Sequence, residues 1–386
     1  MRILHLASFN GNIGDIANHQ GFYNLWKKFI SEKVEFVPLE IREFYKSWNV
    51  RQYDEELIEY INSFDLFVMG GGTFFDVKWE YSVTGTTINL SKQQLDQITC
   101  PIIINGMGVE ISEKNSSQEC IEKFKEFFEY ILNNDNIIVS VRNDASKKMI
   151  EKYLGEKYMK KVYVIPDTGF FTDAKSYFHP EIKDGNVSVA INVAKDREDE
   201  RWPDSQFDYV AYCKEMAAFI NKMLVNRNDI RFVFVPHIPS DLEASYDVIK
   251  YLDDRHVRTR VTVAPYLNGG NTPGDYVVDL YRKCDLTIGM RYHSNICSIA
   301  VHTPTLAIFT FQKHVELYEN IDLHNRIITV NKTHFLDEIY SKVNNLLDNK
   351  IEYKENNKYL IEEMLKDIEP YFMNIKKMLT RYNIHK

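Results

Sequence analysis

A regular alternation of short apolar runs and longer helical patterns constrains the fold of this chain most strongly. In the first half, helical patterns at roughly 15–31, 54–62, 92–98, 116–133 and 144–154 separate the runs "RILHLA", "VEFVPL", "DLFVMG", "PIIING", "IIVSV" and "VYVIP". Runs rich in Val and Ile between amphipathic helices are typical of a parallel sheet covered on both faces. We therefore predict a Rossmann-like, doubly wound α/β domain over residues 1–166.

The alternation starts again after residues 166–186, a stretch broken by Pro, Gly and Asp that we interpret as a domain linker. The new runs are "VSVAINV", "RFVFVP", "RVTVAP", "DLTIG", "TLAIF" and "RIITV", with helices expected at about 205–226, 241–253, 273–283 and from 294. We predict a second Rossmann-like domain over 187–350 and C-terminal helices over 351–386. Ligands of such sheets bind beyond the carboxyl ends of the strands, so the loops at those ends are the candidates for chemistry.

Composition and charge exclude several classes of protein. The formal net charge of -8 argues against a general nucleic-acid binder, which needs Lys and Arg to hold phosphates. No apolar run is long enough to span a membrane. The start "MRILHLASFNGN" lacks the features of a signal peptide, and the five cysteines are dispersed without a CxxC pair, so we expect a reduced, cytoplasmic setting with every cysteine in the core.

Metal and serine-nucleophile chemistry are not indicated by the motifs. His237, His293, His302 and His314 show no HExxH or similar ligand spacing, and the chain has no G-x-S-x-G elbow. We expect neither a metal nor a bound cofactor.

Glycine-rich loops follow two strands of the first half. In "FNGNIGD", Gly11 and Gly14 flank Asn12 and permit free N–H groups at a helix start to hold an anion. Asp15 either caps that helix or accepts hydrogen bonds from a sugar hydroxyl. In "VMGGGTFFD", the glycines let the backbone approach a ligand or a facing loop, and a strained turn without a ligand is the alternative. The candidate binding residues of this second loop are Gly71, Gly72, Thr73 and Asp76.

Three further loops carry candidate polar residues. Arg142 in "SVRNDAS" either projects toward a ligand or pairs with Asp144. Arg197 lies among acidic residues in "INVAKDREDERW", which indicates a solvated loop. His237 and Asp241 follow a strand in "VPHIPSD", where Asp241 is a cap candidate.

The stretch "TIGMRYHSNICSIA" concentrates the chemistry of the second half. Arg291, His293 and Ser294 lie between the end of a strand and a helix predicted to start near Ser294, where backbone donors and the helix dipole favour an anion. The guanidinium fork suits a carboxylate or phosphate, and the imidazole can transfer a proton near neutral pH. The structural alternative is that Arg291 pairs with an acid and His293 bonds a carbonyl.

The ordered set "GNIGD", "GGGTFFD", "NGMGV", "SVRNDAS", "PDTGF" and "GMRYHSNICSIA", followed by "TPTLAIF", resembles the polysaccharide pyruvyl transferase family. The resemblance implies a GT-B-like fold of two Rossmann-like domains facing a cleft, with a C-terminal helix that crosses back to the first domain. It implies transfer of pyruvate from phosphoenolpyruvate to a sugar as a ketal, in exopolysaccharide or cell-surface glycan biosynthesis, without metal or nucleotide.

Under this resemblance the second domain takes the donor and the first takes the acceptor, a sugar, glycan or lipid-linked saccharide. Arg291 holds the carboxylate or phosphate, and His293 donates the proton or contacts the leaving phosphate. Asp15 or Asp76 orients or deprotonates the sugar. Arg142, Arg197 and Lys313, the last in "FTFQKH", are further cation candidates, and His237 and Ser294 complete the expected binding set.

Two other functions fit the same residues. A GT-B glycosyltransferase would hold a nucleotide diphosphate with the same helix start and arginine. A non-catalytic sugar- or anion-binding protein would need Arg291 but not His293. The C-terminal "YFMNIKKMLTRYNIHK" suits a docked helix, and a peripheral contact with the inner face of a membrane is the alternative.

Overall fold

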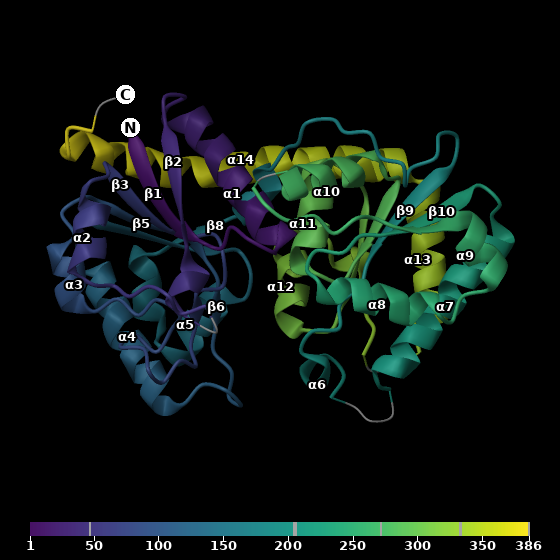
Figure 1. Cartoon of the computed structure of the whole chain (residues 1–386), viewed down its shortest axis with the longest axis horizontal. Helices are drawn as coiled ribbons and strands as arrows, with labels where there is room; N and C mark the ends of the chain where they lie inside the picture. Colours follow the sequence, from purple (N-terminus) through teal and green to yellow (C-terminus); the bar gives the residue numbers. More distant parts are fainter. Residues whose placement is uncertain (46–47, 204–206, 271, 332–333, 385–386) are drawn as a thin grey trace. The chain divides into compact units, whose positions relative to one another are not determined.

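The computed structural model describes residues 1–45, 48–203, 207–270, 272–331 and 334–384, and the side chains of residues 312–314 are outside the described set. The chain forms two compact units (Figure 1). Unit 1 comprises Met1–Phe9, Phe22–Thr168 and Met364–Lys386, and unit 2 comprises Asn10–Gly21 and Gly169–Glu363. Helices α1 (Ile13–Phe29) and α14 (Lys350–Arg381) therefore each contribute residues to both units.

Unit 1 is built on a six-stranded parallel sheet with the order β2-β1-β3-β5-β7-β8. The strands are β1 (Arg2–Ala7), β2 (Glu35–Glu40), β3 (Leu66–Gly70), β5 (Ile102–Met107), β7 (Ile137–Arg142) and β8 (Tyr163–Ile165). The helices between them are α2 (Glu55–Asn62), α3 (Lys92–Gln97), α4 (Gln118–Leu132) and α5 (Ser146–Tyr153). Because β1 lies between β2 and β3, the strand order reverses there, and the loops after β1 and β3 leave the same edge of the sheet.

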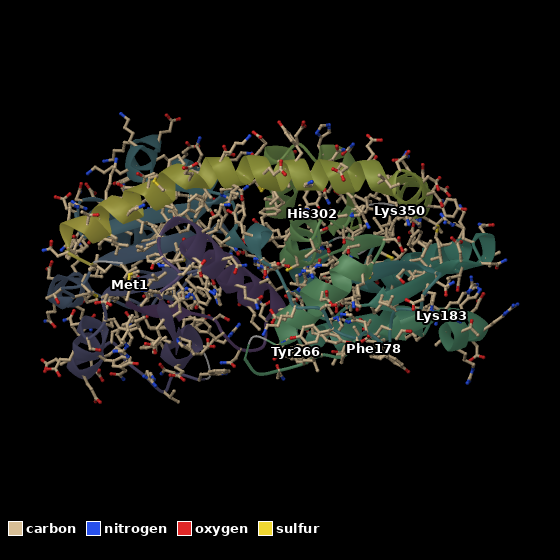
Figure 2. All side chains as sticks on the ribbon, turned by 90° about the horizontal axis from the view of Figure 1, so that it is seen from above. Met1, Phe178, Lys183, Tyr266, His302 and Lys350 are labelled. Atoms are coloured by element: carbon tan, nitrogen blue, oxygen red, sulfur yellow. The ribbon has the colours of Figure 1, made fainter. Side chains whose placement is uncertain are left out.

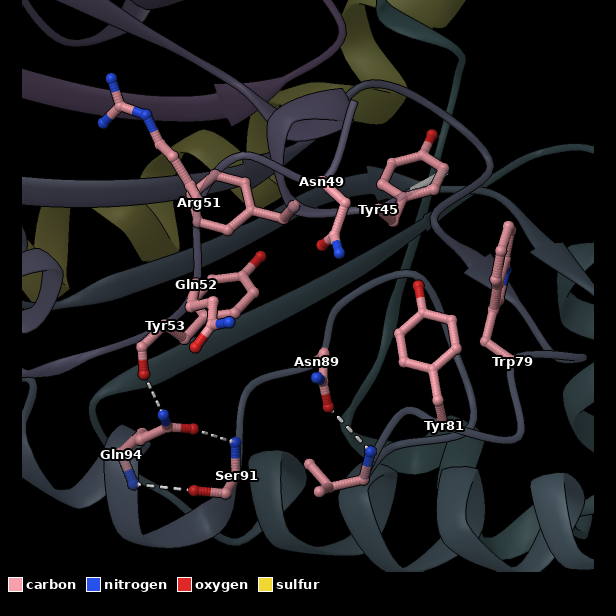
Figure 3. Close-up of a pocket in the computed structure, with 12 residues that line it drawn as sticks. Tyr45, Asn49, Arg51, Gln52, Tyr53, Trp79, Tyr81, Asn89, Ser91 and Gln94 are labelled. Carbon is pink, nitrogen blue, oxygen red and sulfur yellow. Dashed lines mark hydrogen bonds between the residues drawn. The ribbon is translucent and has the colours of Figure 1, made fainter. Parts of the chain in front are cut away.

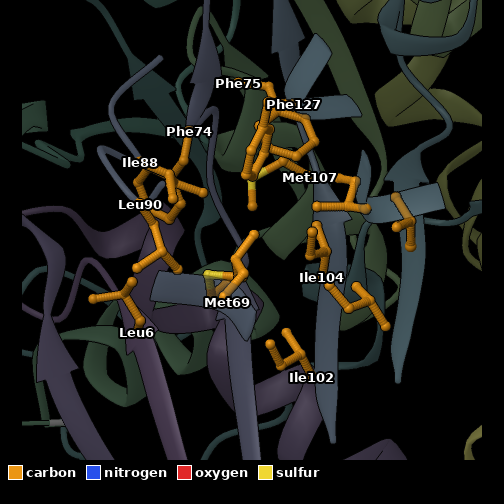
Figure 4. Packing of buried hydrophobic residues seen from close by; sticks show 14 of the residues in the cluster. Leu6, Met69, Phe74, Phe75, Ile88, Leu90, Ile102, Ile104, Met107 and Phe127 are labelled. Carbon is orange, nitrogen blue, oxygen red and sulfur yellow. The ribbon is translucent and has the colours of Figure 1, made fainter. Parts of the chain in front are cut away.

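The core of unit 1 packs apolar side chains of the strands against the helices and loops. Met69, Ile104 and Met107 lie near Phe75 and Phe127 in Figure 4. The last part of α14 also packs on this unit: the Phe372 ring lies 5.3 Å from that of Phe29, and the buried Tyr371 hydroxyl donates to Asn105 Oδ1. The predicted C-terminal helix therefore belongs to the first domain along its second half.

Unit 2 has a six-stranded parallel sheet with the order β11-β10-β9-β12-β13-β14. The strands are β9 (Val187–Asn192), β10 (Ile230–Phe234), β11 (Val261–Val263), β12 (Leu286–Gly289), β13 (Thr305–Phe309) and β14 (Ile327–Thr329). This is the strand order of a dinucleotide-binding Rossmann fold, whose switch point lies between β9 and β12. A ligand site is expected at that point.

Helices cover this second sheet. They are α6 (Glu198–Arg201), α7 (Tyr209–Asn226), α8 (Ser240–Ile249), α9 (Asp254–Arg260), α10 (Thr272–Lys283), α11 (Tyr292–Ala300), α12 (Gln312–Asn320) and α13 (Leu336–Asp348). Both predicted doubly wound α/β sheets are thus confirmed, and every predicted strand is present. Two expectations need correction: the helix expected over 241–253 ends at Ile249 as α8, and α11 begins at Tyr292 rather than near Ser294. Helix α9 and the small pair β4 (Phe75–Asp76) and β6 (Val109–Glu110) were not predicted.

The predicted linker holds one short 3-10 turn, η3 (Thr168–Phe171), and then runs as irregular chain on which Phe178 is 86% exposed (Figure 2). All five cysteines are buried and free, as expected of core residues. None of the described helices is both long and apolar enough to cross a lipid bilayer.

Candidate functional site

A buried asparagine ties together the strand ends at the switch point of unit 2. Asn192, the last residue of β9, accepts a hydrogen bond on Oδ1 from the Arg291 backbone N–H at 2.9 Å. Its Nδ2 donates to the Val235 carbonyl at 2.9 Å, beyond the end of β10. One side chain thus fixes the loops after β9, β10 and β12 at the same edge.

These loops enclose a pocket of about 140 Å³. It is lined by Asn12, Asp196, Arg197, Arg201, His237, Arg291, Tyr292, His293 and Phe311. Five of the residues predicted from sequence are therefore brought together: Asn12, Arg197, His237, Arg291 and His293. All of them belong to unit 2, because the segment that contains Asn12 packs with that unit.

Arg291 forms a charged network with two carboxylates. Its Nε lies 2.7 Å from Asp241 Oδ2, and its Nη2 lies 2.5 Å from Asp241 Oδ1 and 2.7 Å from Asp196 Oδ1. The structural alternative for Arg291, pairing with an acid, is therefore observed. The third nitrogen, Nη1, has no hydrogen-bond partner among the described residues, and the side chain remains 15% exposed. Arg291 can thus bind a ligand through Nη1 while Asp241 holds its plane.

Asp241 is the buried anchor of this arrangement. It lies in the first turn of α8 with its side chain 0% exposed, and it also accepts a hydrogen bond from the His237 backbone N–H at 2.9 Å. Burial alone lowers the pKa of Arg291, but Asp241 and Asp196 outweigh burial and raise it. Arg291 therefore stays charged throughout the physiological range.

A second arginine shares Asp196 and was not among the residues predicted to bind substrate. Arg201 is 3% exposed; its Nη2 lies 3.3 Å from Asp196 Oδ1 and its Nη1 donates to Thr310 Oγ1. Burial lowers its pKa to about 10, so it keeps its charge at neutral pH. Burial raises the pKa of Asp196, but Arg291 and Arg201 outweigh burial and lower it. The alternating acids and bases around Arg201 in "INVAKDREDERW" predict a solvated loop, and nothing in that pattern indicates that Arg201 turns inward.

An aromatic ring supports two of the guanidiniums. The carbon centres of Arg197 and Arg201 lie 4.9 Å and 4.7 Å from the centroid of the Phe311 ring. Arg197 also bonds Glu200 from its Nε at 3.0 Å, and it has a left-handed backbone with φ of 60°. Cation–π contact and the ion pair hold Arg197 over the pocket.

His293 lies in the first turn of α11, directly against α1. A Cβ at position 14 would stand 2.4 Å from Nδ1 of His293, so only glycine at position 14 allows this approach. The first turn of α11 supplies backbone N–H groups at the positive end of the helix dipole. Imidazole, helix start and guanidinium therefore meet at one pocket.

His237 is fully buried and uncharged at neutral pH. Its Nε2 lies 2.7 Å from the Tyr281 hydroxyl, and burial, followed by the charges of Arg291 and His293, lowers its pKa well below the usual value. Its carbonyl accepts from the Ile13 N–H at 3.3 Å, which seats the start of α1 on unit 2. His237 thus joins the pocket wall to the glycine loop.

The glycine loop itself is shaped by two local hydrogen bonds. Asn12 Oδ1 accepts from the Gly14 N–H at 3.0 Å, which makes Asn12 the cap of α1, and Gly11 has a φ of 74° while its carbonyl accepts from Tyr266. Asp15 lies in the first turn of α1 and is not among the residues that line the pocket. Its predicted part in sugar binding remains a prediction.

Two further residues of unit 2 were predicted to bind substrate, and Ser294 is not among those that line the pocket. Ser294 is fully buried, and its hydroxyl donates to the Arg291 carbonyl at 2.7 Å, so it shapes the turn that presents Arg291. Lys313 lies in α12, and its side chain is outside the described residues.

The predicted residues of unit 1 form a separate cluster. Arg142 is 6% exposed; its Nη2 lies 3.0 Å from Asp144 and donates to Thr73 Oγ1, and its Nη1 lies 3.3 Å from the fully buried Asp167. The alternative in which Arg142 pairs with Asp144 is thus observed, and Asp167 is a second acidic partner.

The rest of the "GGGTFFD" loop is held by backbone contacts. The Gly71 N–H donates to the Asn105 carbonyl at 3.1 Å, and the Gly72 carbonyl accepts from Gly108 at 2.9 Å. Asp76 pairs with Lys78 at 2.7 Å. These contacts fit the prediction that the glycines let the backbone approach a facing loop.

Solved structures place the fold among the GT-B-like sugar-nucleotide enzymes with two Rossmann-like domains. UDP-GlcNAc 2-epimerase from Neisseria meningitidis has a TM-score of 0.55 and 11% identity over 99% of this chain and 100% of that one. Anabaena HepE, solved with UDP and glucose, has a TM-score of 0.53 and 10% identity over 99% and 98%. At these identities the likeness concerns the fold alone.

The sequence match is more specific than the fold. The chain belongs to the polysaccharide pyruvyl transferase family, whose profile matches residues 12–308. That span begins at Asn12 of the pocket and includes Arg291 and His293. The amylovoran biosynthesis protein AmsJ of Erwinia amylovora is 24% identical over 354 residues, which cover 84% of this chain and 75% of AmsJ. The chain is therefore a member of a transferase family and is similar to a protein of amylovoran biosynthesis.

Proposed function

We propose that this protein transfers pyruvate from phosphoenolpyruvate to two hydroxyls of a sugar, and that the unit 2 pocket binds the donor. The observation that carries the proposal is the Nη1 of Arg291, which has no hydrogen-bond partner in the described part of the chain and lies beside His293 and the start of α11. Phosphoenolpyruvate carries a carboxylate and a phosphate, which are the groups that a guanidinium and helix N–H groups bind best.

The size of the pocket supports a small donor. Its volume of about 140 Å³ lies well below the roughly 300–1,000 Å³ that drug-sized ligands need. A three-carbon phosphate matches this volume better than a nucleotide sugar does. The glycosyltransferase alternative is therefore the weaker of the two donor hypotheses.

The reaction balances without a redox partner. A proton adds to the methylene carbon C3 of phosphoenolpyruvate, and a sugar hydroxyl oxygen bonds to C2. The bond from C2 to the phosphate oxygen then breaks, inorganic phosphate leaves, and the second hydroxyl oxygen bonds to C2 to close the ketal. Of the two hydroxyl protons, one replaces the proton given to C3 and the other goes to the departing phosphate.

The residues of the pocket divide this work. Arg291 Nη1 and the first N–H groups of α11 bind the donor's anionic groups, and the nearby Arg197 and Arg201 add positive charge. His293 carries the proton to C3 or contacts the leaving phosphate, since an imidazole exchanges protons near neutral pH. The acceptor is a saccharide, in line with the polysaccharide family and with AmsJ.

Calorimetric titration with phosphoenolpyruvate tests the donor. We expect saturable binding that weakens at least tenfold in Arg291→Lys, which keeps a charge but loses the fork. Asp337→Asn, an exposed change elsewhere in unit 2, is the control and should bind as the wild type does. Binding of UDP with no response to phosphoenolpyruvate would replace the proposal with the nucleotide-sugar hypothesis.

Single-turnover assays separate catalysis from binding. His293→Ala should bind phosphoenolpyruvate but release phosphate at least 100-fold more slowly in the presence of acceptor. Unchanged phosphate release by His293→Ala would remove the assigned role of His293. Binding without any release by the wild-type protein would favour the non-catalytic binding protein.

A further inference from the structure

Unit 1 contains a second pocket, of about 720 Å³, that shares no residue with the donor pocket. Its lining includes the aromatic residues Tyr45, Tyr53, Trp79 and Tyr81 and the carboxamides Asn49 and Asn89. In Figure 3, Tyr53 lies on one side of the pocket and Trp79 and Tyr81 on the other, with the amide side chains between them. None of these residues belongs to a motif of the sequence analysis.

Three rings form a corner on one side of the pocket. Trp79 meets Tyr45 edge-to-face at 5.4 Å and Tyr81 at 5.8 Å, with interplanar angles of 75° in both pairs. Tyr81 is nevertheless 58% exposed. Trp79 is oriented by Tyr45 and Tyr81, and the exposed Tyr81 ring offers a face to an apolar ligand.

Two of the residues that line the pocket carry a buried hydrogen-bond donor. The Tyr53 hydroxyl and the Trp79 indole N–H are buried and have no hydrogen-bond partner among the described residues. Burial, followed by the nearby Tyr45 and Tyr81, raises the pKa of Tyr53, so the hydroxyl stays protonated. Buried polar groups in native proteins are nearly always bonded, so these two donors stand out, and the polar groups that line the pocket beside them are the carboxamides.

The charge of the pocket does not favour an anion such as the donor. Arg51 is the one charged side chain among the described lining residues, and its Nε lies 2.5 Å from Glu43 Oε2. The guanidinium is therefore neutralised in place. A ligand suited to this pocket is neutral, has apolar C–H faces for the rings, and carries several hydroxyls for the amides and phenols. A pyranose has all three properties.

We propose that this pocket binds a neutral pyranose residue of the saccharide acceptor. The proposal rests on the proposed function for the identity of the ligand as the acceptor, but sugar binding itself can be measured without a donor. The volume exceeds that of one sugar ring, so a disaccharide unit fits, and Trp79 and Tyr81 stack on its C–H faces.

Fluorine NMR of the protein labelled with 5-fluorotryptophan tests this directly, because the chain has four tryptophans. The line that disappears from the spectrum of Trp79→Phe is that of Trp79. Titration with methyl β-D-galactopyranoside, lactose and cellobiose should shift that line saturably for at least one probe. The lines of Trp26 and Trp202, whose side chains are buried with only 0% and 6% exposed, should not move. No shift of the Trp79 line with any of the three sugars would overturn the proposal.

Matched variants locate the site. Tyr81→Ala, followed on the Trp79 line, and Trp79→Ala, followed by calorimetry, should each weaken the affinity for the sugar about tenfold, the upper end expected for loss of an aromatic contact. Tyr246→Ala removes an aromatic side chain that is 66% exposed on α8 in unit 2 and should change nothing. Equal affinity in all variants would contradict the site.

The same titration distinguishes this proposal from the proposed function. In Arg291→Lys, sugar binding at Trp79 should persist while phosphoenolpyruvate binding weakens. If neither the wild type nor any variant binds phosphoenolpyruvate while sugar binding is intact, the proposed donor is wrong and the pocket of unit 1 remains a saccharide site.

Discussion

Gly14 lies against the imidazole of His293, so closely that a Cβ there would stand 2.4 Å from Nδ1 and 2.6 Å from the ring carbon Cγ. Gly14→Ala must therefore push His293 out of its place. We expect phosphate release from phosphoenolpyruvate to fall at least tenfold, because a shift of about 1 Å at a reacting group can cost 100-fold. A steady-state assay measures the rate of phosphate release, and thermal unfolding shows whether the variant also loses stability.

Gly185→Ala provides the opposite case. Gly185 has a φ of 79° and nothing within 4 Å of its would-be Cβ, so alanine there costs about 1 kcal/mol of backbone strain and touches no catalytic residue. The variant should lose stability but keep its rate. If Gly14→Ala also kept its rate, His293 would not need its observed position.

Arg291→Ala should destabilise the protein as well as weaken donor binding. Asp241 is fully buried and loses its bidentate partner, and an uncompensated buried charge costs about 3–5 kcal/mol. Chemical denaturation measures the loss in the free energy of unfolding.

Arg291→Lys separates the two roles. The ammonium group still compensates Asp241, so the loss of stability should be under half that of Arg291→Ala, while the fork that binds phosphoenolpyruvate is lost. A lysine variant as unstable as the alanine variant would mean that the geometry of the pair, rather than its charge, holds the loop.

Arg142 gives a contrasting prediction in unit 1. Arg142→Gln leaves Asp167 buried without its cation and should lower the free energy of unfolding by about 3 kcal/mol or more. Phosphoenolpyruvate affinity of the folded protein should stay within twofold of wild type, since all residues of the donor pocket belong to unit 2. A tenfold loss of affinity with unchanged stability would instead place Arg142 in substrate binding.

Periodicity alone predicted the two doubly wound sheets, because buried parallel strands leave unmistakable Val- and Ile-rich runs. It could not predict the partners of Arg291, since Asp241 lies 50 residues away and only the fold brings it near. Asp241 looked like a helix cap, and its carboxylate does accept backbone N–H groups. The pattern "GNIGD" indicates a glycine-rich turn, but the contact that requires glycine at position 14 is with His293, and it exists only when both segments are folded.

The aromatic pocket of unit 1 was beyond sequence reasoning for another reason. Its residues come from the segments after β2 and after β4, and no spacing links them. Aromatic residues are abundant in this chain, with 24 Tyr and 23 Phe, so the few that face a pocket cannot be told from those in the core. Exposure of Tyr81 and the rigid corner around Trp79 are properties of the folded unit.

Stability should fall with pH below about 6.5 because of His237. Its pKa is lowered in the folded protein, so the unfolded chain binds the proton first, near the ordinary histidine pKa of about 6.5. The stabilising contribution is therefore fully present above that pH and is lost as the pH falls toward the folded pKa, by up to about 1.4 kcal/mol per pH unit. His237→Gln keeps a hydrogen-bonding group toward Tyr281 but cannot titrate. Urea denaturation between pH 7.5 and 5 should show that the free energy of unfolding falls less steeply with decreasing pH in the variant than in the wild type. Parallel curves for the two proteins would mean that His237 takes up its proton equally in the folded and unfolded states.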